Sequence, residues 1–238
     1  MGDLRMRTAL TRFLRICKRG LSADARNDLH WYHHGRPKRV SAKALFEEYA
    51  WALLVAGIAR RSADTWADRT DFWETFTLSR CRRYPAAHLL RKVRVSANNR
   101  MGRKLKAIHA LGRSLYGLNP RQVADRFLGG ELRTSRLAEQ HALMLVEKLP
   151  FIRQTSGRFI IRNLGGELIK DDRYLNGISR YFGCSEDDFK AVGRSLGWKL
   201  GKVDLVVWCY CEQEIRSTRR IQRHLDALDL WRRSRAAG

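Results

Sequence analysis

The sequence predicts an all-α protein, and its apolar periodicity, its helix-boundary residues and its lack of strand alternation all favour that fold class. Apolar residues recur at three- and four-residue spacing along most of the chain, as they do on the buried face of a helix. Convincing period-two alternation, internal repeats and low-complexity tracts are absent. We therefore expect many short helices joined by short turns.

The first helix signals lie in the N-terminal quarter. Residues 1–20 are predicted to form a short basic helix or a loose arm, and the polar segment His30–Arg39 (HWYHHGRPKR) is a predicted break. Ser41 is a predicted N-cap for a buried helix whose apolar residues extend to Ile58. These signals divide the chain into a basic N-terminal helix or arm at 1–40 and a helical core at 41–238.

The core shows the same periodicity further along. The segment Arg103–Tyr116 is amphipathic and is followed by the helix-ending residues Gly117 and Pro120. The other predicted helices are Val123–Leu128, Ser135–Leu149, Ser156–Asn163, Asp172–Phe182, Glu186–Gly197 and Lys202–Trp231.

The charge of the chain predicts a polyanionic partner. Lys and Arg number 47 against 24 for Asp and Glu, which gives a formal net charge of +23. Arg is much more frequent than Lys, and the planar guanidinium suits bidentate phosphate contacts. The basic residues extend from Arg5 to Arg235, whereas a membrane-surface protein concentrates them on one amphipathic segment. We therefore expect double-stranded DNA as the partner, and no membrane.

The composition also predicts a compartment. The longest apolar run, Ala50–Ala59, is too short to span a bilayer, and the arginine-rich N-terminal segment lacks a signal-peptide core. The five cysteines are odd in number, which favours reduced thiols over a disulfide framework. We expect a cytoplasmic, nucleoid-associated monomer.

The block Leu145–Gly183 (LVEKLPFIRQTSGRFIIRNLGGELIKDDRYLNGISRYFG) carries the most specific pattern: helix, turn with a proline, helix, Gly-Gly break, acidic loop, helix. It resembles the core of the helix-hairpin-helix DNA glycosylase superfamily. In that family a Leu-Pro-Gly-x-Gly hairpin presents backbone N–H groups to a phosphate, and a following loop presents an aspartate to the sugar. By this resemblance Leu149-Pro150 opens the hairpin, at about 145–163, and Asp172-Arg173-Tyr174-Leu175 belongs to the catalytic loop, at about 165–175.

The resemblance continues on both sides of this block. Phe46–Ala50 is similar to the family's first core helix, Arg103–Ile108 to a second helix, and Val203–Trp208 to the closing helix, expected at about 202–231. The similarity covers roughly residues 41–215. It implies a multi-helix, helix-hairpin-helix DNA glycosylase-like fold of two packed helical subdomains.

Asp172 is the expected catalytic residue. A glycosylase must rotate its target base out of the duplex, and cleavage of the N-glycosidic bond builds positive charge on the sugar. A carboxylate stabilises that charge or orients the attacking water. The alternative for Asp172 is an N-cap of the helix that follows, a role compatible with catalysis. Asp171 is the second choice, because the Asp-x-Tyr-Leu register resembles the family's motif from Asp172.

Two departures from the family pattern refine this expectation. Thr155 stands where bifunctional members carry a Schiff-base lysine, so we expect a monofunctional enzyme without lyase activity. Phe151-Ile152-Arg153 stands where Gly-x-Gly is expected, so side-chain donors and the next helix N-terminus would have to hold the phosphate. For Arg153, the alternative is a solvated surface arginine. The residues expected to contact DNA are Arg153, Gln154, Thr155, Ser156, Arg60, Arg61 and Arg173.

We expect no metal and no cofactor. Cys209 and Cys211 are too few for an iron–sulfur cluster, and the histidines of the His30–His34 segment have no Cys or acidic partner at ligand spacing. A basic loop that contacts DNA is the simpler interpretation of that segment. Within it, Trp31 and Tyr32 are candidates for base stacking or for a duplex wedge.

Two other function classes remain open. One is a non-catalytic DNA-binding protein that uses the hairpin for phosphate contacts alone. The other is a metal-dependent nuclease in which Asp171, Asp172, Asp187 and Asp188 hold the metal. Within the glycosylase hypothesis, the substrate is an alkylated base or a bulky hypermodified phage-type base, which corresponds to DNA repair or to anti-phage defence.

Overall fold

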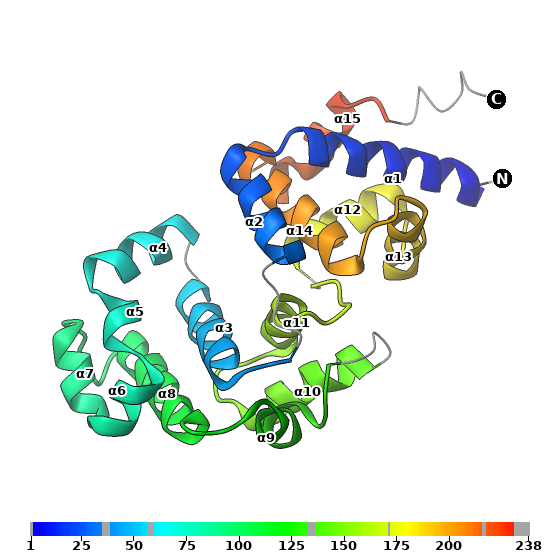
Figure 1. Ribbon diagram of the computed structural model, residues 1–238. Helices are drawn as coiled ribbons and strands as arrows, with labels where there is room; N and C mark the ends of the chain where they lie inside the picture. Colours follow the sequence, from blue (N-terminus) through cyan, green and yellow to red (C-terminus); the bar gives the residue numbers. More distant parts are fainter. Residues whose placement is uncertain are drawn as a thin grey trace. The chain divides into compact units, whose positions relative to one another are not determined.

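The computed structural model describes residues 2–34, 39–56, 60–132, 137–170, 172–215 and 218–230. Helices joined by turns and short loops make up these residues, and no β-strand occurs among them (Figure 1). The predicted all-α class is confirmed. No helix in the described ranges is both long and apolar enough to cross a membrane. The chain forms two compact units, unit 1 from residues 1–36 and 167–238, and unit 2 from residues 37–166.

Unit 1 joins the two ends of the chain. Its helices are α1 (Gly2–Arg19), α2 (Ala23–His34), α12 (Arg173–Phe182), α13 (Glu186–Ser195), α14 (Leu200–Tyr210) and α15 (Ile221–Ala227). A π-helical turn, η3 (Cys211–Ile215), and a 3-10 turn, η4 (Thr218–Arg220), lie between α14 and α15.

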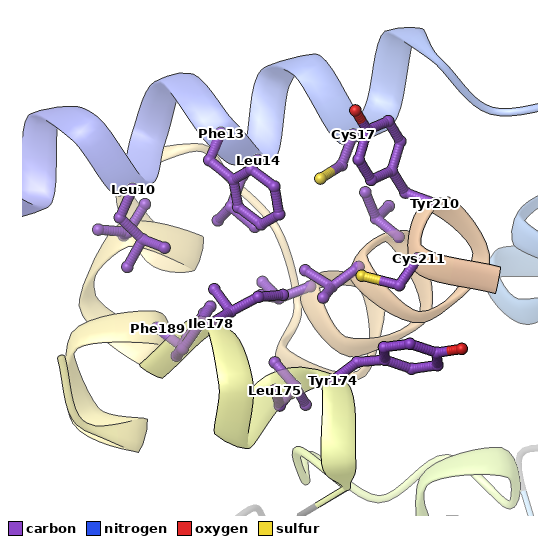
Figure 2. Packing of buried hydrophobic residues seen from close by; sticks show 14 of the residues in the cluster. Leu10, Phe13, Leu14, Cys17, Tyr174, Leu175, Ile178, Phe189, Tyr210 and Cys211 are labelled. Carbon is purple, nitrogen blue, oxygen red and sulfur yellow. The ribbon is translucent and has the colours of Figure 1, made fainter. Parts of the chain in front are cut away.

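Helix α1 is a core element of unit 1. Its apolar residues recur at three- and four-residue spacing and are buried, while most of its arginines lie at the intervening positions. Figure 2 shows its side chains pointing toward those of α12 and α14. Burial of each large apolar side chain contributes about 1.5–3 kcal/mol to folding. The buried side chains of α1 are Met6, Ala9, Leu10, Phe13, Leu14 and Cys17.

The structure divides the chain differently from the predicted boundary at residue 40. Helix α1 packs against α12, α13 and α14, whose residues lie more than 150 positions away in the sequence. The apolar face of α1 is buried against helices that are distant in the sequence. Its apolar spacing therefore does not show which helices it packs against. The segment predicted as a short basic helix or a loose arm contains the helix α1 and belongs to unit 1.

Unit 2 holds the middle of the chain. Its helices are α3 (Ala42–Val55), α4 (Arg60–Arg69), α5 (Phe72–Thr75), α6 (Leu78–Arg83), α7 (Ala86–Lys92), α8 (Arg100–Leu115), α9 (Pro120–Val123), α10 (Ala138–Lys148) and α11 (Gln154–Asn163). A π-helical turn, η1 (Ala124–Leu128), follows α9 directly. Helix α8 packs against α3, α6 and α7, and a Cβ on Gly112 would come within 2.9 Å of side chains of α3 and α6. This glycine therefore allows close helix packing.

The predicted helix boundaries hold in part. Ser41 is the N-cap of α3, where its hydroxyl accepts a hydrogen bond from the backbone N–H of Ala44 at 3.1 Å. The sequence analysis predicts no helix in residues 60–92, where the structure has α4 to α7. Thr77 and Pro85 occupy the N-cap positions of α6 and α7.

The predicted closing helix at 202–231 is interrupted. The regular helix α14 ends at Tyr210, and the backbone widens into η3 before α15 begins at Ile221. Cys211 and Ile215 of η3 are buried, while Glu212 contacts residues at the start of α12. Apolar spacing near 3.6 does not distinguish a π-helical turn from a continuous α-helix, which explains the error.

Candidate functional site

Helices α10 and α11 form the hairpin that the sequence predicts at about 145–163. They pack closely, since a Cβ on Gly157 of α11 would lie 2.7 Å from the carbonyl oxygen of Ala142 on α10. An ion pair joins Arg158 Nη2 to Glu139 Oε2 at 2.8 Å. Glycine at position 157 is thus required for the close packing of the two helices.

The turn between these helices is anchored on its inner side. Leu149 and Ile152 are buried, and the hydroxyl of Tyr49 on α3 donates a hydrogen bond to the Pro150 carbonyl at 2.9 Å. Phe151 lies between these anchors with φ = +64°, a left-handed conformation, and it is 50% exposed. The turn therefore has the backbone conformation that a glycine would favour, although no glycine is present.

The predicted phosphate contacts lie at the start of α11. Arg153 occupies the N-cap position, where its side chain makes no capping hydrogen bond; Arg153 and Gln154 are exposed, and Thr155 and Ser156 are partly exposed. The first-turn N–H groups of a helix lack intrahelical acceptors and favour an anion. Exposure of Arg153 suits a phosphate contact and a solvated arginine equally.

Several predicted residues fall beyond the described part of the structure. Asp171 is outside the described residues. The side chains of Trp31 and Tyr32 in α2, and of Arg60 and Arg61 at the start of α4, are outside them as well. Their proposed contacts with DNA stay predictions.

Asp172 is the N-cap of α12. Its Oδ1 accepts hydrogen bonds from the backbone N–H groups of Tyr174 at 2.9 Å and Leu175 at 3.1 Å. The capping role is therefore confirmed. Its carboxylate lies at the positive end of the helix dipole, which stabilises a negative charge there.

The other carboxylate oxygen faces a lysine. Lys170 Nζ lies 3.6 Å from Asp172 Oδ2, and the two side chains are only 19% and 10% exposed. The same ammonium lies 5.8 Å from the centre of the Trp208 ring on α14. Lys170 does not stand in the register of the family's Schiff-base lysine, a position that Thr155 occupies. Lys170 and Asp172 are two positions apart in the sequence, and this short separation is the signal that relates them.

The loop that carries both residues is fixed to α14. Glu167 Oε2 accepts a hydrogen bond from the backbone N–H of Leu200 at 3.0 Å, and Asp204 Oδ2 accepts one from that of Lys170 at 3.2 Å. Leu168 and Ile169 between them are buried. The backbone before Asp172 is thus held by polar contacts and by packing.

A second polar group adjoins Asp172 along α12. The hydroxyl of Tyr174 donates to Glu212 Oε1 at 2.8 Å, and Arg173 Nη2 lies 3.5 Å from the same oxygen. Burial, with the hydrogen bond to Glu212, raises the pKa of Tyr174 to about 12. Arg173, a predicted DNA contact, is exposed and so combines this ion pair with access to solvent. Glu212 could not be identified from the sequence, because the η3 turn that positions it was not predicted.

Asp187, Asp188 and the cysteines lie in environments that account for them structurally. Asp188 forms a capping box with Ser185, and Asp187 pairs with Lys190 at 3.0 Å. No group of three or more His, Cys, Asp or Glu side chains that could hold a metal ion occurs in the described ranges, which do not include Asp171. All five cysteines lie in the described ranges, are buried and form no disulfide bond, and burial raises the pKa of the Cys211 thiol.

The candidate residues are divided between the units, with the hairpin in unit 2 and the Asp172 group in unit 1. Each group is defined by contacts within its own unit. Comparisons of the chain with protein-family models, with curated proteins and with solved structures find no match.

Proposed function

We propose that this protein is a monofunctional DNA glycosylase that flips out and excises a damaged or modified base with Asp172 as its catalytic carboxylate. The observation that carries the proposal is the environment of Asp172. Its side chain is 10% exposed, Oδ1 is held by two backbone N–H groups, and Oδ2 faces the Lys170 ammonium. A carboxylate fixed in this way stabilises positive charge without having to reorganise during the reaction.

The proposed reaction is hydrolysis of the N-glycosidic bond. The bond between C1′ of deoxyribose and the base nitrogen breaks, the water hydroxyl adds to C1′, and the water proton leaves with the base. Asp172 Oδ2 stabilises the charge that develops on the sugar, or orients the water. Lys170 Nζ pairs with Asp172 Oδ2, and we assign it no nucleophilic role, because Thr155 stands where bifunctional members of the family carry the Schiff-base lysine. The product is an abasic site in an intact strand.

The hairpin and the charge support duplex DNA as the substrate. The start of α11 combines first-turn N–H groups with the exposed side chains of Arg153 and Gln154. The net charge of +23 provides sequence-independent attraction to phosphates. An alkylated base and a bulky hypermodified phage-type base are the two substrate classes that we propose.

A panel of duplexes, each with one modified base, tests this function. After incubation with the protein, each duplex is treated with alkali and scored for strand breaks at the modified position. We expect breaks only after alkali, in at least one alkylated or hypermodified duplex, and equally with EDTA present. Breaks before alkali that EDTA abolishes would identify a nuclease instead.

A non-catalytic DNA-binding protein is the second candidate, and one observation favours it. Asp172 already has a structural role as the N-cap of α12, which by itself accounts for an aspartate at this position. This candidate predicts tight, salt-sensitive binding of duplex DNA with no alkali-labile product from any duplex in the panel.

A further inference from the structure

Phe151 combines two unfavourable features at the apex of the hairpin. Its φ of +64° lies in the left-handed region, where a side chain with a Cβ is strained. Its ring is 50% exposed, so a large apolar surface remains in water. Strained residues that persist in a well-supported structure are concentrated at functional positions.

Folding of the turn does not require this aromatic ring. Leu149 and Ile152 supply the buried side chains of the turn, and Tyr49 holds the Pro150 carbonyl. A glycine at position 151 would adopt the same backbone without strain and would expose no ring. Phe151 is therefore the side chain of the turn that folding requires least, and it is the one that is exposed to solvent.

The surroundings of Phe151 indicate the chemistry of its partner. Lys148, Arg153 and Gln154 are exposed next to the turn, with Glu147 as the exposed acidic neighbour. The first-turn N–H groups of the ten-residue helix α11 add an anion-binding edge. A ligand that suits an apolar ring between such groups has flat apolar faces linked by anionic groups, which describes a nucleic-acid strand.

We propose that Phe151 stacks against an unpaired or displaced base of the bound DNA while the start of α11 holds the adjacent phosphate. The inference rests on the proposed DNA-binding function and adds to it a contact that distinguishes disrupted from fully paired duplex. Stacking of one base on an aromatic side chain contributes about 1–3 kcal/mol, which corresponds to roughly fivefold to 150-fold in affinity.

Fluorescence anisotropy with two duplexes tests the inference. One duplex is fully paired, and the other carries a tetrahydrofuran abasic analogue that leaves the opposite base unpaired. Phe151→Gly and Phe151→Asn both tolerate the left-handed backbone. We expect each to lower affinity for the abasic duplex by about tenfold or more, with little change for the paired duplex. Phe151→Trp should retain the preference. The matched control is Leu143→Ala, because Leu143 is also about half exposed but lies on α10 away from the turn.

Each of the following results would overturn the proposal that Phe151 stacks on a base. If wild-type protein prefers the abasic duplex and the Gly and Asn variants keep that preference, Phe151 does not stack, and DNA binding stands. If wild-type protein binds neither duplex, the proposed function fails together with the inference. A large drop in melting temperature for both variants would assign Phe151 to folding. A dimer that becomes monomeric in Phe151→Gly would assign it to contact with a second copy.

Discussion

Replacement of Asp172 separates its charge from its capping role. Asp172→Asn keeps an N-cap side chain that can accept from the N–H groups of Tyr174 and Leu175, but it removes the negative charge beside Lys170. Asp172→Ala removes both. The two variants therefore differ in the cap and share the loss of charge.

The structure gives the expected magnitudes for stability. Loss of the cap costs about 1 kcal/mol, within a range of about 0.5–2 kcal/mol. The Lys170 side chain is 19% exposed, and loss of the Asp172 carboxylate 3.6 Å from its Nζ costs about 1–3 kcal/mol. We expect the free energy of unfolding to fall by about 1–3 kcal/mol in Asp172→Asn, and by about 1 kcal/mol more in Asp172→Ala.

Catalysis should follow a different order. Both variants lack the carboxylate charge, so excision should fall by about two orders of magnitude or more in each, which corresponds to about 2.7 kcal/mol in the activation free energy. Binding to duplex DNA should persist or strengthen, because a negative charge has been removed near the phosphates.

The assays are urea unfolding and single-turnover excision on the duplex identified by the panel. Asp187→Asn is the control, because the Asp187 side chain is 86% exposed; it should change stability by less than about 0.5 kcal/mol and leave excision unchanged. Near wild-type excision by a folded Asp172→Asn protein would refute the catalytic assignment, and capping would then be the sufficient account of Asp172.

Four further results are expected. Affinity for duplex DNA should fall by about a thousandfold or more between about 50 and 200 mM salt, as for roughly six neutralised phosphates, and a flat response would remove the electrostatic argument. Borohydride should trap no covalent complex, because Thr155 replaces the family's lysine; a trapped complex that disappears in Lys170→Met would make Lys170 the nucleophile. Gly157→Ala should lower the free energy of unfolding, measured in urea, by about 1–3 kcal/mol, because its Cβ would lie 2.7 Å from the Ala142 carbonyl oxygen. Ser156→Ala on the same helix should cost far less, and equal effects of the two variants would contradict the close packing at Gly157. Since the pKa of Tyr174 is raised to about 12 by burial and by the Glu212 hydrogen bond, the unfolded phenol ionises first, and stability should fall between about pH 10 and 12. Tyr174→Phe should reduce this loss of stability at high pH. An unchanged dependence of the free energy of unfolding on pH would contradict the raised pKa of Tyr174.

Local signals in the sequence identified features whose physical causes lie within a few residues. The all-α class follows from apolar spacing, and the caps at Ser41 and Asp172 follow from a short polar side chain placed just before a helix. The hairpin was located by its Leu-Pro turn between two amphipathic segments.

Tertiary structure decided what depends on residues far apart in the chain. The sequence does not predict the division into units, because the partners of α1 lie beyond residue 172. The apolar face of an amphipathic helix does not identify the helices against which it packs. Fixing of the Asp172 loop depends on Asp204 and Leu200 of α14, more than 25 positions away. The left-handed backbone and the exposure of Phe151 depend on contacts that hold the turn from its inner side. Those contacts are the buried side chains of Leu149 and Ile152 and the hydrogen bond from the Tyr49 hydroxyl. Backbone conformation at a turn is set by packing on both sides of it, and spacing along the sequence does not encode that packing.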